Sequence, residues 1–235
     1  MRRTARILGT LLVVAGVGLL AWTITVWRWQ DPFTGLYTHY EQHRLAASLD
    51  KEFKAYAAQQ TRGRDAIVAE QRRLTRDAGR LRRLAHEGQA IGRIIVPRMG
   101  LNMVLVNGTD HGTLEKGPGR DLRTYMPGQG QLVYVAGHRT TYLAPFSHID
   151  QLRKGDRITL EMPYATFVYR VTGHRIVTAD DLAVLRSKGH EELELQACHP
   201  RFFATHRYIA FAQPVRVIPR VGQPFTPAAP APATA

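Results

Sequence analysis

Cysteine is almost absent from this chain of 235 residues, in which Cys198 is the only one. A single thiol cannot form a disulfide within the chain, so it is either a small apolar core residue or a reactive group. Acidic side chains are also scarce, 19 in total against 32 lysines and arginines, and the formal net charge is +13. No nucleic-acid-binding motif accompanies this charge, and the arginines gather in one stretch, so no nucleic-acid partner is expected.

Charged residues are also missing from the segment Ile7–Trp27. A helix of this length spans the roughly 30 Å of a bilayer core. The basic residues Arg2, Arg3 and Arg6 precede it, and the positive-inside rule therefore predicts a cytoplasmic N-terminus and an extracytoplasmic remainder. We interpret residues 1–29 as a cytoplasmic N-terminus and an uncleaved, single-pass signal anchor. A cleaved signal peptide is the alternative, but its apolar region would be shorter and a small-x-small site would follow.

Residues 30–90 form the basic stretch, rich in Ala, Leu, Arg, Glu and Gln, which are good helix formers. Leu45, Leu49 and Phe53 recur at a helical spacing. The pattern predicts a solvated helical stalk; a coiled coil is less favoured because the heptads are not sustained. Outside a membrane, the positive charge favours association with anionic lipids or cell-wall polymers. At the other end, residues 223–235 are rich in Pro and Ala and are predicted to be a disordered tail.

The composition changes at Ile91, where short, β-branched apolar runs separated by Gly and Pro begin. These runs are residues 91–96, 103–106, 131–136, 157–162, 166–171, 175–177, 192–197 and 207–212. Such runs are typical of strands separated by turns. Eight short strands in about 130 residues predict one mainly β domain, an antiparallel barrel or sandwich large enough to hold a core. We set its limits at residues 91–222.

Cys198 lies at the end of one predicted strand, and the following His199-Pro200 should interrupt the strand ladder. A thiol at such a break can point into a cleft, but a buried core thiol is equally consistent with this placement. His138 ends another apolar strand, and its imidazole titrates near neutrality, so it could activate a thiol or protonate a leaving amine. His199 is a weaker candidate because adjacent side chains in a strand point to opposite faces.

Arg207 begins the strand that follows Cys198. If the two strands form a hairpin, Arg207 lies beside the end of the Cys198 strand. A guanidinium there could hold an oxyanion or a substrate carbonyl. Arg201, inside the connecting loop, is the alternative. Together, Cys198, His138 and Arg207 form a plausible nucleophile, acid/base and oxyanion stabiliser.

The motifs around these residues resemble those of sortases, most closely the class E sortases of actinobacteria, which are Gram-positive. The matching segments lie in order between Ile91 and Val217, and the histidine and cysteine blocks are the most specific. They are Val96-Pro-Arg-Met-Gly-Leu, Leu114-Glu-Lys-Gly-Pro-Gly, Pro127-Gly-Gln-Gly, Ala136-Gly-His-Arg-Thr-Thr-Tyr-Leu-Ala-Pro-Phe, and Cys198-His-Pro-Arg-Phe with Arg207.

The resemblance implies an eight-stranded sortase-type β-barrel, preceded by a transmembrane helix and a helical stalk. It implies a cysteine transpeptidase in which Cys198 attacks the Thr–Gly bond of an LAXTG- or LPXTG-like sorting signal on a secreted protein. His138 would protonate the leaving amine, and Arg207 would stabilise the substrate or the oxyanion. The amino group of a cell-wall precursor would then resolve the thioacyl enzyme. This chemistry needs no metal or other cofactor.

The chain departs from the family pattern just before the cysteine. Ala197 stands where sortases usually have a threonine, and Glu194 lies three residues earlier. These departures put substrate preference and rate in doubt, and they allow the alternative of a catalytically impaired, sortase-like envelope scaffold or binding module. An L,D-transpeptidase is a weaker alternative: His111-Gly-Thr fits part of its signature, but the expected Ser-His-Gly does not precede Cys198.

Overall fold

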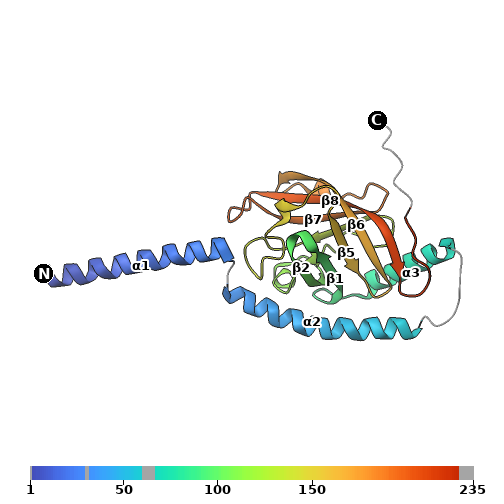
Figure 1. The fold of residues 1–235 in the computed structure, drawn as a ribbon, viewed down its shortest axis with the longest axis horizontal. Helices are drawn as coiled ribbons and strands as arrows, with labels where there is room; N and C mark the ends of the chain where they lie inside the picture. The colour runs from blue at the N-terminus through green and yellow to red at the C-terminus, as the bar shows by residue number, and fades with distance from the viewer. Residues whose placement is uncertain (1, 30–31, 60–66, 228–235) are drawn as a thin grey trace.

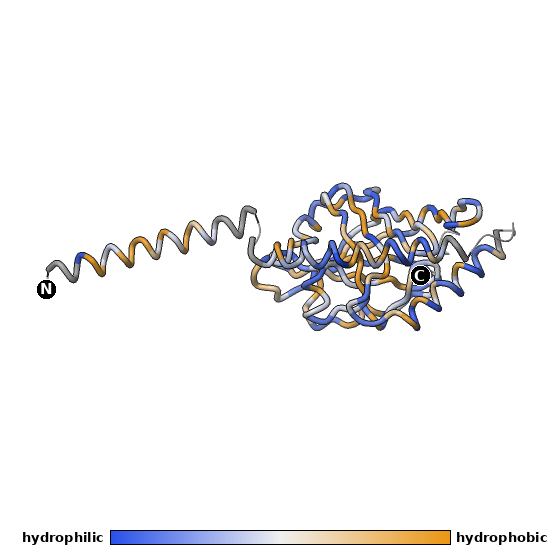
Figure 2. The backbone as a smooth tube through the Cα atoms, turned by 90° about the horizontal axis from the view of Figure 1, so that it is seen from below, coloured by the Kyte–Doolittle hydropathy of each residue, from blue (hydrophilic) through white to orange (hydrophobic). Residues whose placement is uncertain are grey.

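Three helices precede the strands in this computed structural model, which describes residues 2–29, 32–59 and 67–227 (Figure 1). They are α1 (Arg2–Trp29), α2 (Pro32–Gln59) and α3 (Ile67–Leu84). Helix α1 extends away from the rest of the molecule, and Figure 2 shows the apolar residues that run along it. Its segment Arg6–Thr23 is long and apolar enough to cross a membrane, and none of it is buried against the protein.

The strands close into a single barrel in the order β1-β2-β3-β4-β7-β8-β6-β5. The prediction of a mainly β fold with an eight-stranded barrel and preceding helices is therefore confirmed. The strands are β1 (Ala90–Val96), β2 (Leu101–Asn107), β3 (Gly119–Arg120), β4 (Leu132–Ala136), β5 (Arg157–Glu161), β6 (Ala165–Thr178), β7 (Glu192–His199) and β8 (His206–Pro219). Short helical turns lie between them: η1 (Pro97–Met99), α4 (His111–Leu114), η2 (Ile149–Gln151) and η3 (Leu182–Leu185).

The number of strands is as expected, but two of them differ from the sequence pattern. The runs 166–171 and 175–177 belong to one long strand, β6, which pairs with β8 across a register shift at Gly173. The missing strand is β3, whose two residues lie among charged and polar neighbours and carry no apolar pattern. The expectation of purely antiparallel pairing is also wrong, because β2–β3 and β4–β7 are parallel. A parallel pair needs a long crossover, and the segment containing β5 and β6 provides it between β4 and β7.

Alternate side chains of the strands fill the barrel, as the period of two in a strand requires. Val133, Phe167, Leu195 and Ala210 are at most 1% exposed and belong to one apolar cluster. The runs that looked like strands in sequence therefore supply the core.

The two helices after α1 lie against the barrel, so a fully solvated stalk is wrong for this region. Leu45 and Leu49 of α2 are buried with Val104 and Val106 of β2. Leu74 of α3 is 2% exposed and belongs to the main core cluster. The amphipathic spacing thus reflects packing on the outside of the sheet, where apolar residues of strands also need cover.

The described part of the C-terminal segment also differs from the expectation of a tail that packs nowhere. Phe225 forms two backbone hydrogen bonds with Val217 of β8, at 2.9 and 3.0 Å, and its side chain contacts the core cluster. Residues 228–235, which include most of the predicted disordered tail, lie outside the described residues.

Candidate active site

The parallel pairing of β4 and β7 brings the ends of these two strands to the same edge of the barrel. Ala136 lies opposite Gln196, and the backbone N–H of Gly137 donates to the Gln196 carbonyl at 3.0 Å. Two residues beyond Ala136 is His138, and two beyond Gln196 is Cys198. Parallel register therefore carries the imidazole and the thiol to one place, although far apart in sequence.

The third candidate arrives through the hairpin of β7 and β8. Cys198 lies directly opposite Arg207 in this antiparallel pair, so the predicted hairpin is confirmed. Directly opposite residues share one face of the sheet, with Cβ atoms about 4.5–5.5 Å apart. The Arg207 guanidinium donates to the carbonyls of Ala204 and His206, at 2.7 and 2.9 Å, which orient it within the loop end of the hairpin.

Cys198, His138 and Arg207 line one cleft of about 280 Å³. One wall is apolar and comes from the η3 segment, with Leu182, Val184 and Leu185. A polar part of the lining comes from the segments around β3, with Thr109, Asp121 and Arg123. The cleft therefore holds a thiol, an imidazole and a guanidinium together with apolar and polar lining residues.

The structure distinguishes a thiol that faces the cleft from a thiol buried in the core. Cys198 is half-buried and faces the cleft, whereas Ala197 is fully buried in the core cluster. Because adjacent strand residues face opposite sides, the side chain at position 197 points into the barrel and not toward the thiol. The missing threonine hydroxyl therefore leaves the lining of the cleft unchanged.

His138 is partly shielded from solvent. Its Nε2 atom is buried and has no hydrogen-bond partner among the described residues. The ring of Tyr142 lies beside it, with centroids 5.0 Å apart. Burial lowers the pKa of His138; the nearby His111 lowers it further, and Glu115 partly opposes both. A lowered pKa favours an imidazole that accepts a proton and returns it during the reaction.

Arg139 is a site residue for which the sequence carried no signal beyond its place after His138. Its buried guanidinium donates to the Cys198 carbonyl at 3.2 Å and forms an ion pair with Asp150 at 2.7 Å. It also lies 3.0 Å from Nδ1 of His199. Arg139 thus links the histidine loop directly to the end of β7, and it engages His199 away from the cleft.

Arg201, the alternative to Arg207, does not line the cleft. Its guanidinium donates to the carbonyl of Ser147, in the loop after His138. It therefore holds two loops together, and Arg207 is the arginine beside the thiol.

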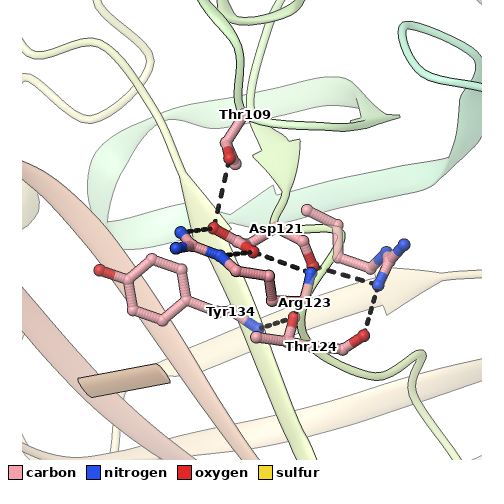
Figure 3. A network of polar contacts seen from close by, with 6 residues as sticks. Thr109, Asp121, Arg123, Thr124 and Tyr134 are labelled. Atoms are coloured by element: carbon pink, nitrogen blue, oxygen red, sulfur yellow. Dashed lines mark hydrogen bonds and ion pairs between the residues drawn. The ribbon is translucent and has the colours of Figure 1, made fainter. Parts of the chain in front are cut away.

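The polar side of the cleft is a hydrogen-bonded network (Figure 3). The Arg123 guanidinium donates to both carboxylate oxygens of Asp121, at 2.9 and 2.7 Å. The Thr109 hydroxyl donates to the same carboxylate. Burial alone would raise the pKa of Asp121, but these bonds hold it below its usual range. The preceding residue, Arg120, is buried, and this burial lowers its pKa to about 10. Within the described ranges, no cluster of three His, Cys, Asp or Glu side chains could hold a metal ion.

Glu194, the other departure from the family pattern, is not among the residues that line the cleft. It is 1% exposed, and burial raises its pKa to about 7, with the neighbouring Glu192 adding to the effect. Lys188 lies 3.8 Å away and partly offsets it. Glu194 therefore bears on stability more directly than on the cleft.

Comparison with known proteins places this fold and site. Residues 94–215 match the Sortase domain family. Sortase D of Bacillus subtilis is 33% identical over 132 residues, which cover 54% of this chain and 65% of that protein. Sortase SrtE1 of Streptomyces coelicolor is 27% identical and matches over 57% of this chain and 42% of its own length. The structure of sortase E from Streptomyces avermitilis superposes with a TM-score of 0.52 at 30% identity, covering 57% of this chain and 93% of the other.

The chain therefore belongs to the sortase family. The similarity to Streptomyces sortase E proteins supports a class E-like member, as the motifs suggested. The matched regions span under two thirds of the length of the curated relatives.

Proposed function

We propose that this protein is a cysteine transpeptidase that cleaves a sorting signal and transfers the acyl part to an amine. Cys198 is the nucleophile, His138 the general acid and base, and Arg207 the stabiliser of the oxyanion. The observation that carries the proposal is that these three side chains, from three different strands or strand ends, line one cleft. Membership of the sortase family supports the same reaction class.

The reaction has two steps. The Cys198 sulfur attacks the carbonyl carbon of the scissile bond, and Arg207 stabilises the resulting oxyanion. As the sulfur attacks, the Cys198 thiol gives its proton to His138. The C–N bond then breaks, the leaving amine takes this proton from His138, and a thioester remains on Cys198. An acceptor amine then attacks the thioester, gives its proton to His138, and releases the thiolate. The balance is an exchange of one amide for another.

For the substrate we propose an LAXTG- or LPXTG-like signal, cut between Thr and Gly, and for the acceptor an amino group of a cell-wall precursor. The class E-like relationship supports both parts of this proposal. The apolar wall formed by Leu182, Val184 and Leu185 is compatible with an apolar side chain of such a peptide.

For the arrangement of the chain we propose a single-pass membrane protein with an extracytoplasmic catalytic domain. The apolar segment Arg6–Thr23 supports a membrane anchor within residues 1–29. We propose a catalytic barrel at residues 91–222, helices at residues 30–90 and a tail at residues 223–235. Because α2 and α3 cover apolar residues of the barrel, we expect an active preparation to need these two helices as well as the barrel.

The proposal is tested with the full-length protein in nanodiscs, incubated with LAXTG or LPXTG peptides and an amine. We expect a mass increase on Cys198 equal to the acyl fragment, and transfer of that fragment to the amine. Cys198→Ala should form no adduct. If a thiol-reactive probe labels Cys198 in the folded protein but neither peptide forms an adduct, the envelope scaffold becomes the better explanation.

A further inference from the structure

The loop that follows His138 has an unusual backbone. Tyr142, Leu143 and Ala144 all have positive φ values, of 52°, 61° and 39°. Residues other than glycine rarely adopt this region, and each instance costs free energy unless the surroundings hold it. Three in succession indicate a loop that is held in place by its neighbours.

Helix α2 supplies one of these neighbours. The backbone N–H of Tyr142 donates to the hydroxyl oxygen of Thr34, near the start of α2, at 2.9 Å. Thr38, one turn further on, donates to the carbonyl of Glu115 at 2.6 Å. The same helix therefore contacts both the His138 loop and the segment after α4, although it is remote from the cleft in sequence.

The side chains of Tyr142 and Glu115 connect these contacts to the histidine. The Tyr142 hydroxyl donates to the Glu115 carboxylate at 2.8 Å, and its ring lies 5.0 Å from the His138 imidazole. We name Thr34, Glu115 and Tyr142 the histidine brace. His111 lies on the same side, 3.1 Å from the Glu115 carboxylate, with its ring 6.4 Å from that of His138.

We propose that Tyr142 and Glu115, held by Thr34 of α2, are positioning residues that orient and shield His138, so that the helix after the membrane anchor controls the general acid of the proposed transpeptidase. The inference rests on the proposed function of this cleft. The Tyr142 ring limits rotation of the imidazole and keeps water from one of its faces. Glu115 fixes the ring of Tyr142 through the phenolic oxygen, and Thr34 fixes its backbone.

Charge around His138 is part of the same arrangement. Glu115 and His111, in and just after α4, act on it electrostatically, and Cys198 and Arg207 line the same cleft. Glu115 raises the pKa of His138, in opposition to burial and His111. Replacing the carboxylate should therefore lower the pKa of the imidazole.

The brace is tested by steady-state kinetics of full-length variants in nanodiscs. Tyr142→Phe removes only the hydroxyl and should lower kcat about 10-fold with little change in KM for the peptide, because misorientation of a catalytic group affects the chemical step. In Glu115→Gln, the limb of the pH profile that reports loss of the His138 proton should move to lower pH. Thr34→Val, which removes the hydroxyl, should lower kcat several-fold. Thr34→Ser, which keeps the hydroxyl, should have a kcat close to that of the wild type.

Thr75 provides a matched control. Its hydroxyl donates to the Gly128 carbonyl at 2.8 Å and ties α3 to the barrel, away from His138. Thr75→Val should change kcat and the pH profile little. The brace is refuted if Thr34→Val and Thr75→Val have equal effects on kcat, or if Glu115→Gln leaves the pH profile unchanged. If the wild-type protein forms no thioacyl adduct, the proposed function fails first, so the two failures are distinguishable.

Discussion

The two sides of the candidate catalytic centre are held in different ways. Cys198 and Arg207 lie opposite each other in one antiparallel hairpin, and continuous backbone pairing fixes their register. His138 lies beyond the end of β4, in a loop that hydrogen-bonds to the Thr34 hydroxyl of α2, to the Glu115 carboxylate just after α4 and to the Cys198 carbonyl of β7. A strand ladder is cooperative, whereas each hydrogen bond to a loop contributes only about 0.5–1.5 kcal/mol. The thiol side should therefore tolerate distant substitutions, and the histidine side should respond to them.

The largest effect is expected on the hairpin itself. Arg207→Ala should lower kcat by about 10²–10³-fold, as loss of a single oxyanion donor does. Arg207→Lys should recover little, because an ammonium group cannot reproduce the fork of the guanidinium. Arg216→Ala, on the exposed part of β8, is the control. Kinetics that are equally impaired in both alanine variants would show that general weakening of β8 is the cause.

Arg139 connects the histidine loop to the end of β7, so replacing it should affect both catalysis and stability. Arg139→Lys should lower kcat about 10-fold and the free energy of unfolding by about 1–3 kcal/mol, since buried polar groups lose partners. Arg201→Lys, which alters a loop contact without a bond to β7, should have a smaller effect on kcat. Denaturant unfolding and kinetics on the same preparations measure both quantities. Equal kcat values for the two variants would show that the link from Arg139 to β7 does not matter for catalysis.

Position 197 tests whether the inner face of β7 is separate from the cleft. Ala197→Thr introduces the residue usual in the family into a fully buried site. Overpacking should lower the free energy of unfolding by about 1–3 kcal/mol. The rate of adduct formation should stay within about twofold of the wild type, because the new side chain faces the barrel interior. A large gain in rate would mean that the hydroxyl reaches the thiol.

The smallest effect is expected at Glu194, on the opposite face of the same strand. Its folded-state pKa rises from 4.5 to about 7, so the folded state binds more protons than the unfolded state in this range. Stability contributed by this group therefore falls as pH rises from 4.5 to 7 and stays low above it. Glu194→Gln should raise the melting temperature at pH 8 by about 2–4 °C, equivalent to about 1 kcal/mol. A smaller gain is expected at pH 5, and an equal gain at both pH values would contradict the assignment.

The order of the chain made some of these relationships predictable. The hairpin that sets Arg207 beside Cys198 follows from two strand patterns joined by a short loop, because local antiparallel pairing needs no further information. The pairing of β4 with β7 could not be inferred in the same way, since a long crossover separates the strands. Strand β3 was missed because its two residues have no apolar alternation.

The packing of α2 on the barrel also could not be predicted from the sequence. The spacing of Leu45 and Leu49 indicated an amphipathic helix, but spacing alone does not predict which surface the apolar face packs against. A solvated stalk and a packed helix have similar patterns. Only the contacts with Val104 and Val106 distinguish them.

Composition and local pattern are therefore enough to indicate an apolar N-terminal segment, a mainly β domain and three candidate residues. The resemblance of the motifs to sortases adds the barrel and the family. These properties depend on residue types and short spacings, which each segment carries within itself. The meeting of His138 with Cys198, the inward direction of Ala197 and the links from Arg139 and Thr34 depend on register and packing between segments distant in sequence. Such contacts arise because closing the barrel and covering its apolar faces satisfies many residues at once, and no single segment encodes that result.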